Sequence, residues 1–519
     1  MDQIISNISS NASPLQLVLT ALGVATLSWI ALRKLTASRL PGRYPPGPPQ
    51  LPIVGNAFNF PLDGWSITFN EWAVKYGDLV YVQLPGMPFF IVNSFDMAHE
   101  LLSKRIQVNS DRKIGYMVTY LMGWSWSPAF RDADEVHRKQ RLMFRRGIGP
   151  TRIPTHDHLI EKGSRNLILD LQFIEGDPIR WITKAVGTAI IELSYGEIMM
   201  KNHGQGLIKL NVDAMHMLEA AFHTVWLVDF FPVLRFLPSW LVSFRRYATH
   251  STTLVNRIRP WPFQEAHELF KAGKLDHSLI RDLFEEFGPS LDVQDSTANL
   301  YFAGVDTTTS VAVSFLLILF VFPEVAKKVQ AEIDSVTGQE RLPTVKDRAK
   351  LPYTEAVWKE SLRWHPNVPN GIPHCSTEDQ TINGYFIPKG SLINPNIGYM
   401  LIDPRIWGDP EAFRPERHLS SHNSNSPNLP NPAVLVFGFG ARTCPGMYFA
   451  DRVGFHLILS LILLFDVLPL AGKDLPKPTD FEYTKSVILY PKNLECRFVP
   501  RNEKASALLS VMNIGASEQ

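Results

Sequence analysis

Hydrophobic residues are most continuous near the start of the chain, from Leu15 to Leu32. This run is at the lower end of the roughly 20 apolar residues that cross a bilayer as a helix, so we predict a membrane anchor at 15–32. Four basic residues follow it between Arg33 and Arg43, whereas only Asp2 is charged before it. By the positive-inside rule residues 1–14 should then face the lumen and the rest of the protein the cytosol. A cleaved signal peptide is the competing interpretation, which the missing basic lead disfavours.

After residue 56, the apolar residues recur with helical spacing in some segments and with strand-like spacing in others. Helical patterns cover Ser290–Phe322, Pro352–Trp364 and Gly446–Leu464, and residues 155–290 contain several amphipathic helices. Two apolar strands, Leu79–Leu84 and Phe89–Asn93, flank a Pro/Gly turn and predict a hairpin. Shorter strand patterns occur at Gly371–His374, Gly384–Gly390 and Ser486–Tyr490. The chain is therefore predicted to be mainly α-helical with small β-sheets.

Composition narrows the class of protein. The 519 residues include 51 basic and 50 acidic side chains, so the overall charge gives no reason to expect nucleic acid as a partner. None of the three cysteines forms a C-x-x-C pair, which excludes a disulfide framework and a zinc-ribbon site. The run Pro45-Pro46-Gly47-Pro48-Pro49 makes residues 33–56 a stiff, extended linker. We expect one catalytic body at 57–500 and a C-terminal tail at 501–519.

The most informative stretch is Phe437–Gly446, which reads F-x-x-G-x-R-x-C-x-G. A single cysteine between glycines suits a thiolate that binds a metal through one bond. Backbone N–H groups that point at its sulfur would lower the thiol pKa and adjust the properties of a bound iron. The alternative is a buried free cysteine beside a turn, which is the interpretation we adopt for Cys375 and Cys496.

This stretch resembles the haem-binding loop of the cytochrome P450 family, since every fixed position of that loop is filled. The resemblance implies a haem-thiolate fold and a haem b whose iron takes Cys444 as its axial ligand. It also implies that Phe437 packs against the haem, that Arg442 reaches a propionate, and that glycines such as Gly446 let the backbone turn beside the porphyrin.

Other parts of the chain match the same family. A helix that usually carries Trp and then Arg four residues later has His137 and Arg141 here, so both could reach one propionate. Because His137 stands where the family usually has tryptophan, its role is less defined than that of Arg141. A histidine or arginine at the position of His374 is expected to contact a propionate.

Residues Ala303–Thr308 (AGVDTT) interrupt a helical pattern and could be a simple kink. In the family this motif activates oxygen, which implies that Ala303 borders the cofactor and that Asp306 and Thr307 form a proton relay. Glu360 and Arg363 share a helix face, and Phe413–Arg417 adds a second arginine. The resemblance implies that these charges form a buried structural network.

The implied reaction is insertion of one oxygen atom from O₂ into a lipophilic molecule, such as a terpenoid or other secondary metabolite, with overall similarity to fungal enzymes. No flavin or nicotinamide motif is present, so electrons from NADPH would come from a separate cytochrome P450 reductase, with cytochrome b5 as an additional donor. The anchor implies the endoplasmic reticulum membrane. Residues 113–130 would cover the pocket and Val225–Phe244 would dip into the bilayer.

Two other functions stay open. A haem-thiolate isomerase or dehydratase needs no O₂, and the intact Asp306–Thr307 pair argues against it. The second alternative is a non-enzymatic haem-binding or membrane-scaffold protein. In such a protein the sequence motifs of the pocket would be free to change.

Overall fold

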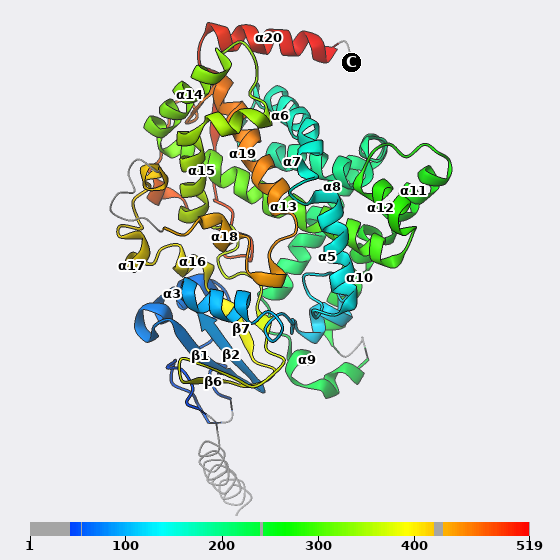
Figure 1. The fold of residues 1–519 in the computed structure, drawn as a ribbon, viewed down its shortest axis with the longest axis vertical. Coiled ribbons are helices and arrows are strands. Elements are labelled where there is room, and N and C mark those ends of the chain that lie inside the picture. The colour runs from blue at the N-terminus through cyan, green and yellow to red at the C-terminus, as the bar shows by residue number, and fades with distance from the viewer. Residues whose placement is uncertain (1–41, 53, 239–241, 420–428, 518–519) are drawn as a thin grey trace, which may run out of the picture.

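The computed structural model describes residues 42–52, 54–238, 242–419 and 429–517. The expected lumenal segment 1–14 and anchor 15–32 lie outside these residues, as do three residues of the apolar segment Val225–Phe244. The described part is mainly helical with three small sheets (Figure 1), as the sequence predicts.

The α-helices run in chain order as follows: α3 (Trp65–Tyr76), α4 (Phe95–Ala98), α5 (Glu135–Ile148), α6 (Asp157–Leu171), α7 (Ile179–Tyr195), α8 (Glu197–Phe222), α9 (Leu227–Phe230), α10 (Ser243–Ile258), α11 (Pro260–Lys271), α12 (Leu279–Phe287), α13 (Leu291–Val321), α14 (Pro323–Thr337), α15 (Pro352–Trp364), α16 (Ile397–Met400), α17 (Pro404–Trp407), α18 (Pro432–Val436), α19 (Met447–Leu464) and α20 (Glu503–Ser517). Two π-helical segments are η1 (His99–Lys104) and η2 (Met117–Leu121). Short 3₁₀ turns are η3 (Ile153–His156), η4 (Pro232–Phe236), η5 (Val345–Lys350), η6 (Pro415–His418), η8 (Gly440–Arg442) and η9 (Pro478–Asp480).

The long helix α13 passes through the middle of the body (Figure 1) and packs on α5, α7, α8 and α19. Ser290 begins it by accepting a hydrogen bond from the Val293 N–H, and Pro323 follows its end. Most of its side chains are buried, because a helix that is apolar on every side belongs in a core. The predicted helix at Ser290–Phe322 is therefore confirmed within one residue at each end.

Two helices, Leu291–Val321 and Met447–Leu464, are long and apolar enough to cross a membrane by length and composition alone. In the most apolar 18 residues of Leu291–Val321, 89% are buried inside the body, and in those of Met447–Leu464, 72% are buried. That burial is typical of core helices.

The largest sheet has four strands in the order β1-β2-β7-β4. β1 (Leu79–Leu84) pairs antiparallel with β2 (Met87–Val92), which lies parallel to β7 (Leu392–Pro395); β4 (His374–Cys375) completes the edge. The hairpin is confirmed, but its second strand begins at Met87, two residues earlier than predicted. Gly86, at φ 68°, lets the chain reverse within a shorter turn.

The two remaining sheets are smaller. β5 (Gln380–Ile382) pairs with β6 (Tyr385–Ile387), and β9 (Cys496–Pro500) lies between β3 (Glu175–Gly176) and β8 (Phe465–Leu468). Ser486–Tyr490, a candidate strand-loop in the sequence, forms no strand and is an irregular loop. It lies against α13 and Asn367: Ser310 Oγ donates to the Leu489 carbonyl (2.6 Å), and Leu489 N–H donates to the Asn367 carbonyl (2.8 Å).

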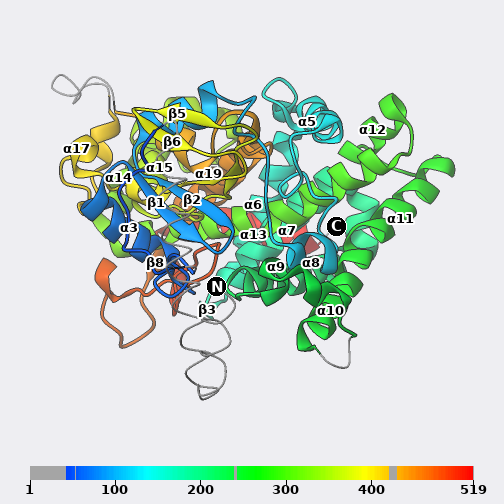
Figure 2. The same cartoon turned by 90° about the horizontal axis from the view of Figure 1, so that it is seen from below.

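Both ends of the described chain are packed against the body. Residues 42–52 run along the sheet: Tyr81 N–H donates to the Pro46 carbonyl at 3.0 Å, and a Cβ at Gly47 would lie 1.9 Å from the Tyr81 carbonyl oxygen. At the other end, α20 buries Ala505, Leu509 and Met512 against the helical core. In the view from below, the sheets and the α8–α12 helices occupy opposite sides (Figure 2).

The expected buried charge network lies between α15 and η6. Glu360 has no exposed surface and accepts hydrogen bonds from Arg363 at 2.9 Å, Arg417 at 3.0 Å and His418 at 2.8 Å. The predicted network is thus confirmed, and His418 is an additional member.

Candidate active site

The loop before α19 holds Cys444 by backbone bonds of its own. Cys444 N–H donates to the Phe437 carbonyl at 2.7 Å, and Arg442 N–H donates to the Phe439 carbonyl at 3.0 Å. Gly440, at φ 55°, approaches η1 so closely that a Cβ there would lie 2.1 Å from the Leu102 carbonyl oxygen. The glycine is therefore required for the loop to fit against η1.

The three cysteines differ in their surroundings. Cys444 is partly accessible, whereas Cys375 and Cys496 are buried, as expected for them. Burial raises the pKa of the Cys444 thiol, while a backbone hydrogen bond from Gly446 and the charge of Arg141 act in the opposite direction. The predicted N–H contact to the sulfur is present, but burial outweighs its effect on the pKa. Cys375 and Cys496, whose pKa values burial raises to about 11 and about 12, lack both influences.

Three arginines gather around this loop. The guanidinium of Arg442 donates to the carbonyls of Ser110 (2.6 Å), Pro128 (2.8 Å) and Arg131 (2.7 Å). Arg141 on α5 donates to the Thr443 carbonyl, which joins α5 to the cysteine loop. Arg112 donates to the Pro373 carbonyl at 2.7 Å, and its Nε has no hydrogen-bond partner among the described residues.

Two histidines belong to the same cluster. His137 is buried one helical turn before Arg141, and burial together with Arg442 and Arg141 lowers its pKa to about 3. His374 is also buried; its Nδ1 lies 2.8 Å from the Asn109 carbonyl oxygen, and burial and Arg112 hold its pKa well below the usual range. Both imidazoles are therefore neutral at pH 7. The single N–H of His374 is donated to the Asn109 carbonyl, whereas His137 has one N–H that it can donate.

This cluster fits a group that carries negative charge. None of Arg112, Arg141 and Arg442 forms an ion pair within the described part of the chain. Burial lowers the pKa of Arg112 and of Arg442, the latter to about 10, and the charge of Arg442 lowers that of Arg112 further. Buried, mutually repelling cations are stabilised when an anion lies between them. The two propionates of a haem are anions of this kind, so the residues present fit that cofactor.

Arg112 is the member of the cluster that the sequence did not reveal. It lies in the irregular region before the aromatic segment 113–130, where no periodicity marks a buried position. Its carbonyl partners, Ile372 and Pro373, are about 260 residues away in the chain. Only the folded chain brings them together.

The expected relay residues lie in the middle of α13. Thr307 Oγ1 donates to the Ala303 carbonyl at 2.7 Å, and Asn367 donates to the Thr307 carbonyl at 3.1 Å. Asp306 is buried, and the Tyr490 hydroxyl lies 2.7 Å from its carbonyl oxygen and 2.9 Å from its Oδ1. The helix assignment continues through this motif, from Leu291 to Val321. The hydroxyls of Thr307 and Thr309 bond back to the carbonyls four residues earlier.

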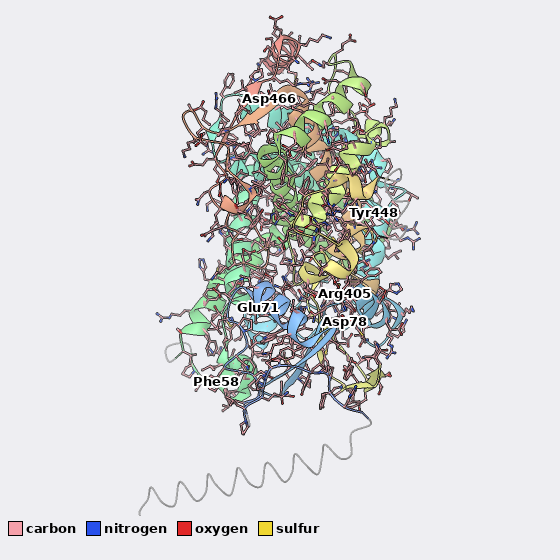
Figure 3. The ribbon with its side chains drawn as sticks, turned by 90° about the vertical axis from the view of Figure 1, so that its left-hand side faces the viewer. Phe58, Glu71, Asp78, Arg405, Tyr448 and Asp466 are labelled. Atoms are coloured by element: carbon pink, nitrogen blue, oxygen red, sulfur yellow. The ribbon has the colours of Figure 1, made fainter. Side chains whose placement is uncertain are left out.

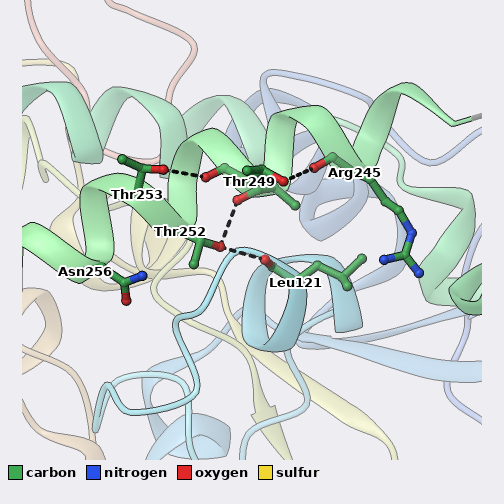
Figure 4. Close-up of a pocket in the computed structure, with 7 residues that line it drawn as sticks. Leu121, Arg245, Thr249, Thr252, Thr253 and Asn256 are labelled. Carbon is green, nitrogen blue, oxygen red and sulfur yellow. Dashed lines mark hydrogen bonds between the residues drawn. The ribbon is translucent and has the colours of Figure 1, made fainter. Parts of the chain in front are cut away.

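A hollow of about 370 Å³ lies elsewhere, between α10 and η2 (Figure 4). Its lining comes from Leu121, Arg245, Ala248, Thr249, Thr252, Thr253 and Asn256. The threonine hydroxyls there donate to backbone carbonyls, as when Thr252 bonds to Leu121 at 3.0 Å and Ala248 at 2.9 Å. These hydroxyl protons are already used, and the hollow contains none of the predicted site residues.

Comparison with known proteins agrees with this geometry. Residues 45–498 match the family model for Cytochrome P450. The chain is 34% identical over 492 residues to cytochrome P450 monooxygenase COX2 of Coprinopsis cinerea, covering 92% of this chain and 93% of that protein. It is 32% identical over 513 residues to cytochrome P450 monooxygenase 226 of Postia placenta, covering 95% of each. It is 31% identical over 521 residues to cytochrome P450 monooxygenase claR of Ampulloclitocybe clavipes, covering 96% of this chain and 95% of that protein.

The chain belongs to the cytochrome P450 family, and these relatives are fungal. It is a monooxygenase of that family, an oxidoreductase that incorporates oxygen from O₂. The family implies a haem cofactor, a redox partner and a lipophilic substrate.

Proposed function

We propose that this protein binds haem b with Cys444 as the iron ligand and hydroxylates a lipophilic secondary metabolite, such as a terpenoid. The bound haem supplies the oxidising chemistry, and a thiolate ligand donates electron density that favours O–O cleavage. The observation that carries the proposal is the cysteine loop beside three buried or partly buried arginines that form no ion pair in the described chain, although Asp111, Asp132 and Asp134 act on the charge of Arg442. The chain's own groups hold the cofactor, position the substrate and deliver protons.

The propionates would be held by charge and by hydrogen bonds. Arg442, Arg141 and Arg112 supply the positive charge, and the unpaired Nε of Arg112 is available as a donor. His137 supplies a neutral N–H donor, since its pKa is lowered to about 3. His374 is neutral too, but it donates its one N–H to the Asn109 carbonyl, so it would pack beside a propionate. Phe437 would pack against the ring, and Ala303 on α13 would border it.

Asp306 and Thr307 would move protons on the substrate side. Thr307 Oγ1 bonds to the Ala303 carbonyl and can rotate to a new acceptor, and Asp306 is the neighbouring acid. A buried acid beside an alcohol can pass a proton while water is kept out. This pair favours the monooxygenase over an isomerase or dehydratase on the same fold, which would not use it.

We place the protein on the endoplasmic reticulum membrane, anchored by residues 15–32. Exposed apolar side chains support a membrane-facing end of the body: Phe58 is 81% exposed and Phe236 is 86% exposed. Phe58 lies at the lower edge in Figure 3, and η4, which contains Phe236, follows α9 at the lower end in Figure 1. Apolar side chains in such a patch can enter a lipid surface.

Electrons would come from NADPH through a separate cytochrome P450 reductase, with cytochrome b5 as an additional donor. The outer face of α5 carries the exposed cations Arg138, Lys139, Arg145 and Arg146. A basic face of this kind increases the association rate of an acidic protein partner. The same helix holds Arg141 against the cysteine loop, which supports a docking face on the side of the molecule where the haem would bind.

The first test is the spectrum of the reduced protein with carbon monoxide. Cys444→Ala should abolish the thiolate-type band and the activity, because it removes the proposed iron ligand. Cys375→Ala and Cys496→Ala are matched controls that should keep both. A thiolate-type band retained in Cys444→Ala would contradict the assignment, and NADPH consumption with reductase would separate a monooxygenase from an isomerase or a scaffold.

A further inference from the structure

One group of titratable side chains outside the haem-binding cluster lies where α8 packs against α13 (Figure 1). It consists of the half-buried Glu219 on α8, the buried Asp306 on α13, and Tyr490 in the loop 484–490. The proposed relay uses Asp306 but assigns no role to Glu219. It also leaves open how protons from solvent reach a carboxyl that is only 9% exposed.

The loop 484–490 connects the two carboxyl groups. Its Ile488 N–H donates to Glu219 Oε1 at 3.2 Å, and two residues later the Tyr490 hydroxyl lies 2.9 Å from Asp306 Oδ1. The loop is fixed to α13 by the bond from Ser310 Oγ to the Leu489 carbonyl. One short segment therefore holds both acids toward the same place between α8 and α13.

Little positive charge compensates these acids. Neither Glu219 nor Asp306 forms an ion pair in the part of the chain that the structure describes. His216, which lies exposed on α8 one turn before Glu219, acts to lower the pKa of Asp306. Burial raises the pKa of Asp306, and burial together with the charge of Asp306 raises the pKa of Glu219 to about 7. Two uncompensated carboxyl groups that share a buried place titrate as a pair and tend to retain a proton.

We infer that Glu219 is the residue that supplies protons to Asp306, and that the two carboxyl groups hold one proton between them at neutral pH. This inference rests on the proposed relay through Asp306 and Thr307. In each transfer an O–H bond of the Glu219 carboxyl breaks and an O–H bond forms on the Asp306 carboxylate. Glu219 is then protonated again from water at the exposed end of the site, near His216. No electrons move in this step.

The direct test is infrared spectroscopy of the resting holoenzyme, because a protonated carboxyl has its own C=O stretching band. The parent protein should show such a band that disappears as the pH rises, with a midpoint near 7. Glu219→Gln should lack this band, since an amide has no proton of this kind while its oxygen can still accept from Ile488 N–H. Glu332→Gln is the matched control: Glu332 also accepts backbone N–H bonds, from Tyr353 and Thr354 at 2.8 Å, but on α14. It should leave the band unchanged.

Turnover gives a second, separate measurement. Glu219→Gln should slow product formation about tenfold and increase the solvent hydrogen isotope effect, since proton supply becomes limiting. Haem content and the substrate-binding spectrum should not change. If instead substrate affinity falls while the isotope effect stays constant, Glu219 contacts substrate and the inference is wrong.

A second variant covers the case in which Glu219→Gln fails to fold. Tyr490→Phe removes the hydroxyl that lowers the pKa of Asp306, so the midpoint of the infrared band should move upward. An unchanged midpoint, or a band that survives in Glu219→Gln, overturns the inference. Failure of the proposed function would appear elsewhere, as a missing thiolate-type band in the parent protein.

Discussion

Two threonines on α13 make the same local bond, but only one belongs to the predicted motif. Thr307 Oγ1 donates to the Ala303 carbonyl and Thr309 Oγ1 to the Val305 carbonyl, each at 2.7 Å. Thr309 is fully buried, whereas Thr307 retains some accessible surface. A proton relay needs a hydroxyl that reaches a reacting group, so the two positions should respond differently to the same substitution.

Thr307→Ala should lower the amount of product formed per NADPH consumed, because it removes the proposed proton donor but little volume. General acid assistance typically contributes about 10²–10⁴-fold in rate, so release of hydrogen peroxide should replace much of the product. Thr307→Ser should recover most of the ratio, and Thr309→Ala, which loses the same kind of bond, should resemble the parent. The measurement is the ratio of product to NADPH; an equal ratio in Thr307→Ala and the parent would refute the relay.

At this scale the sequence predicted the residues that stand in a recognisable motif. Cys444 could be found from its loop, Phe437–Gly446, and Arg141 from its helix, although its partner Thr443 lies 302 residues away. Arg112 and Glu219 stand in no such motif, and their partners are also distant in the chain. Nothing in the residues around them distinguishes them from ordinary surface charges.

Among the elements, helices with strong start and stop signals were predicted best. The helix predicted at Pro352–Trp364 has those bounds in the structure, because Pro352 begins it and the chain turns at His365. The segment Ser486–Tyr490 was predicted less well, since a short apolar run of this kind is typical of a strand. Its backbone bonds to side chains of α8 and α13 and to Asn367, which sequence spacing cannot reveal.

The α15–η6 network provides a test of an element contact. Burial alone would raise the pKa of Glu360, but hydrogen bonds from His418 and Arg363 outweigh it and lower the pKa. A carboxyl with a lowered pKa stabilises the fold at neutral pH, and this contribution is lost as the pH falls below the usual range of a glutamic acid. Glu360→Gln should therefore destabilise the protein at pH 7, because it leaves Arg363 buried without a countercharge.

The expected loss is about 3–5 kcal/mol, the usual result of breaking one side of a buried ion pair. It should appear in denaturant unfolding of the holoenzyme at pH 7 and become smaller only as the pH falls below 4.5, the ordinary pKa of a glutamic acid. Glu355→Gln on the same helix removes a partly exposed partner of Arg348 and should cost less than about 1 kcal/mol. Equal losses in the two variants would show that the buried network has no special role.

The whole molecule exposes apolar side chains at both ends. Phe58 is labelled in the lower part of Figure 3, and α9, which precedes the η4 turn containing Phe236, lies at the lower end of Figure 1, opposite α20. α20 exposes Val511 at 65%, and Phe173, which is 81% exposed, follows Gln172, a hydrogen-bond partner of Asn513 on α20. Exposure of single apolar residues is ordinary, so the proposal that only one end contacts the membrane needs a test that compares both.

Removal of residues 1–42 should weaken attachment to lipid vesicles without loss of haem, because the predicted anchor contains none of the residues that fit the cofactor. Residual attachment should remain, since Phe58 and Phe236 are still exposed on the truncated protein. Changing both to Ser in the truncated protein should release it further, whereas Val511→Ser at the opposite end should have no effect. The measurement is vesicle flotation together with the carbon monoxide spectrum. Loss of the thiolate-type band on truncation would show that residues 1–42 belong to the body, and equal release by Val511→Ser would show that attachment is not confined to one end.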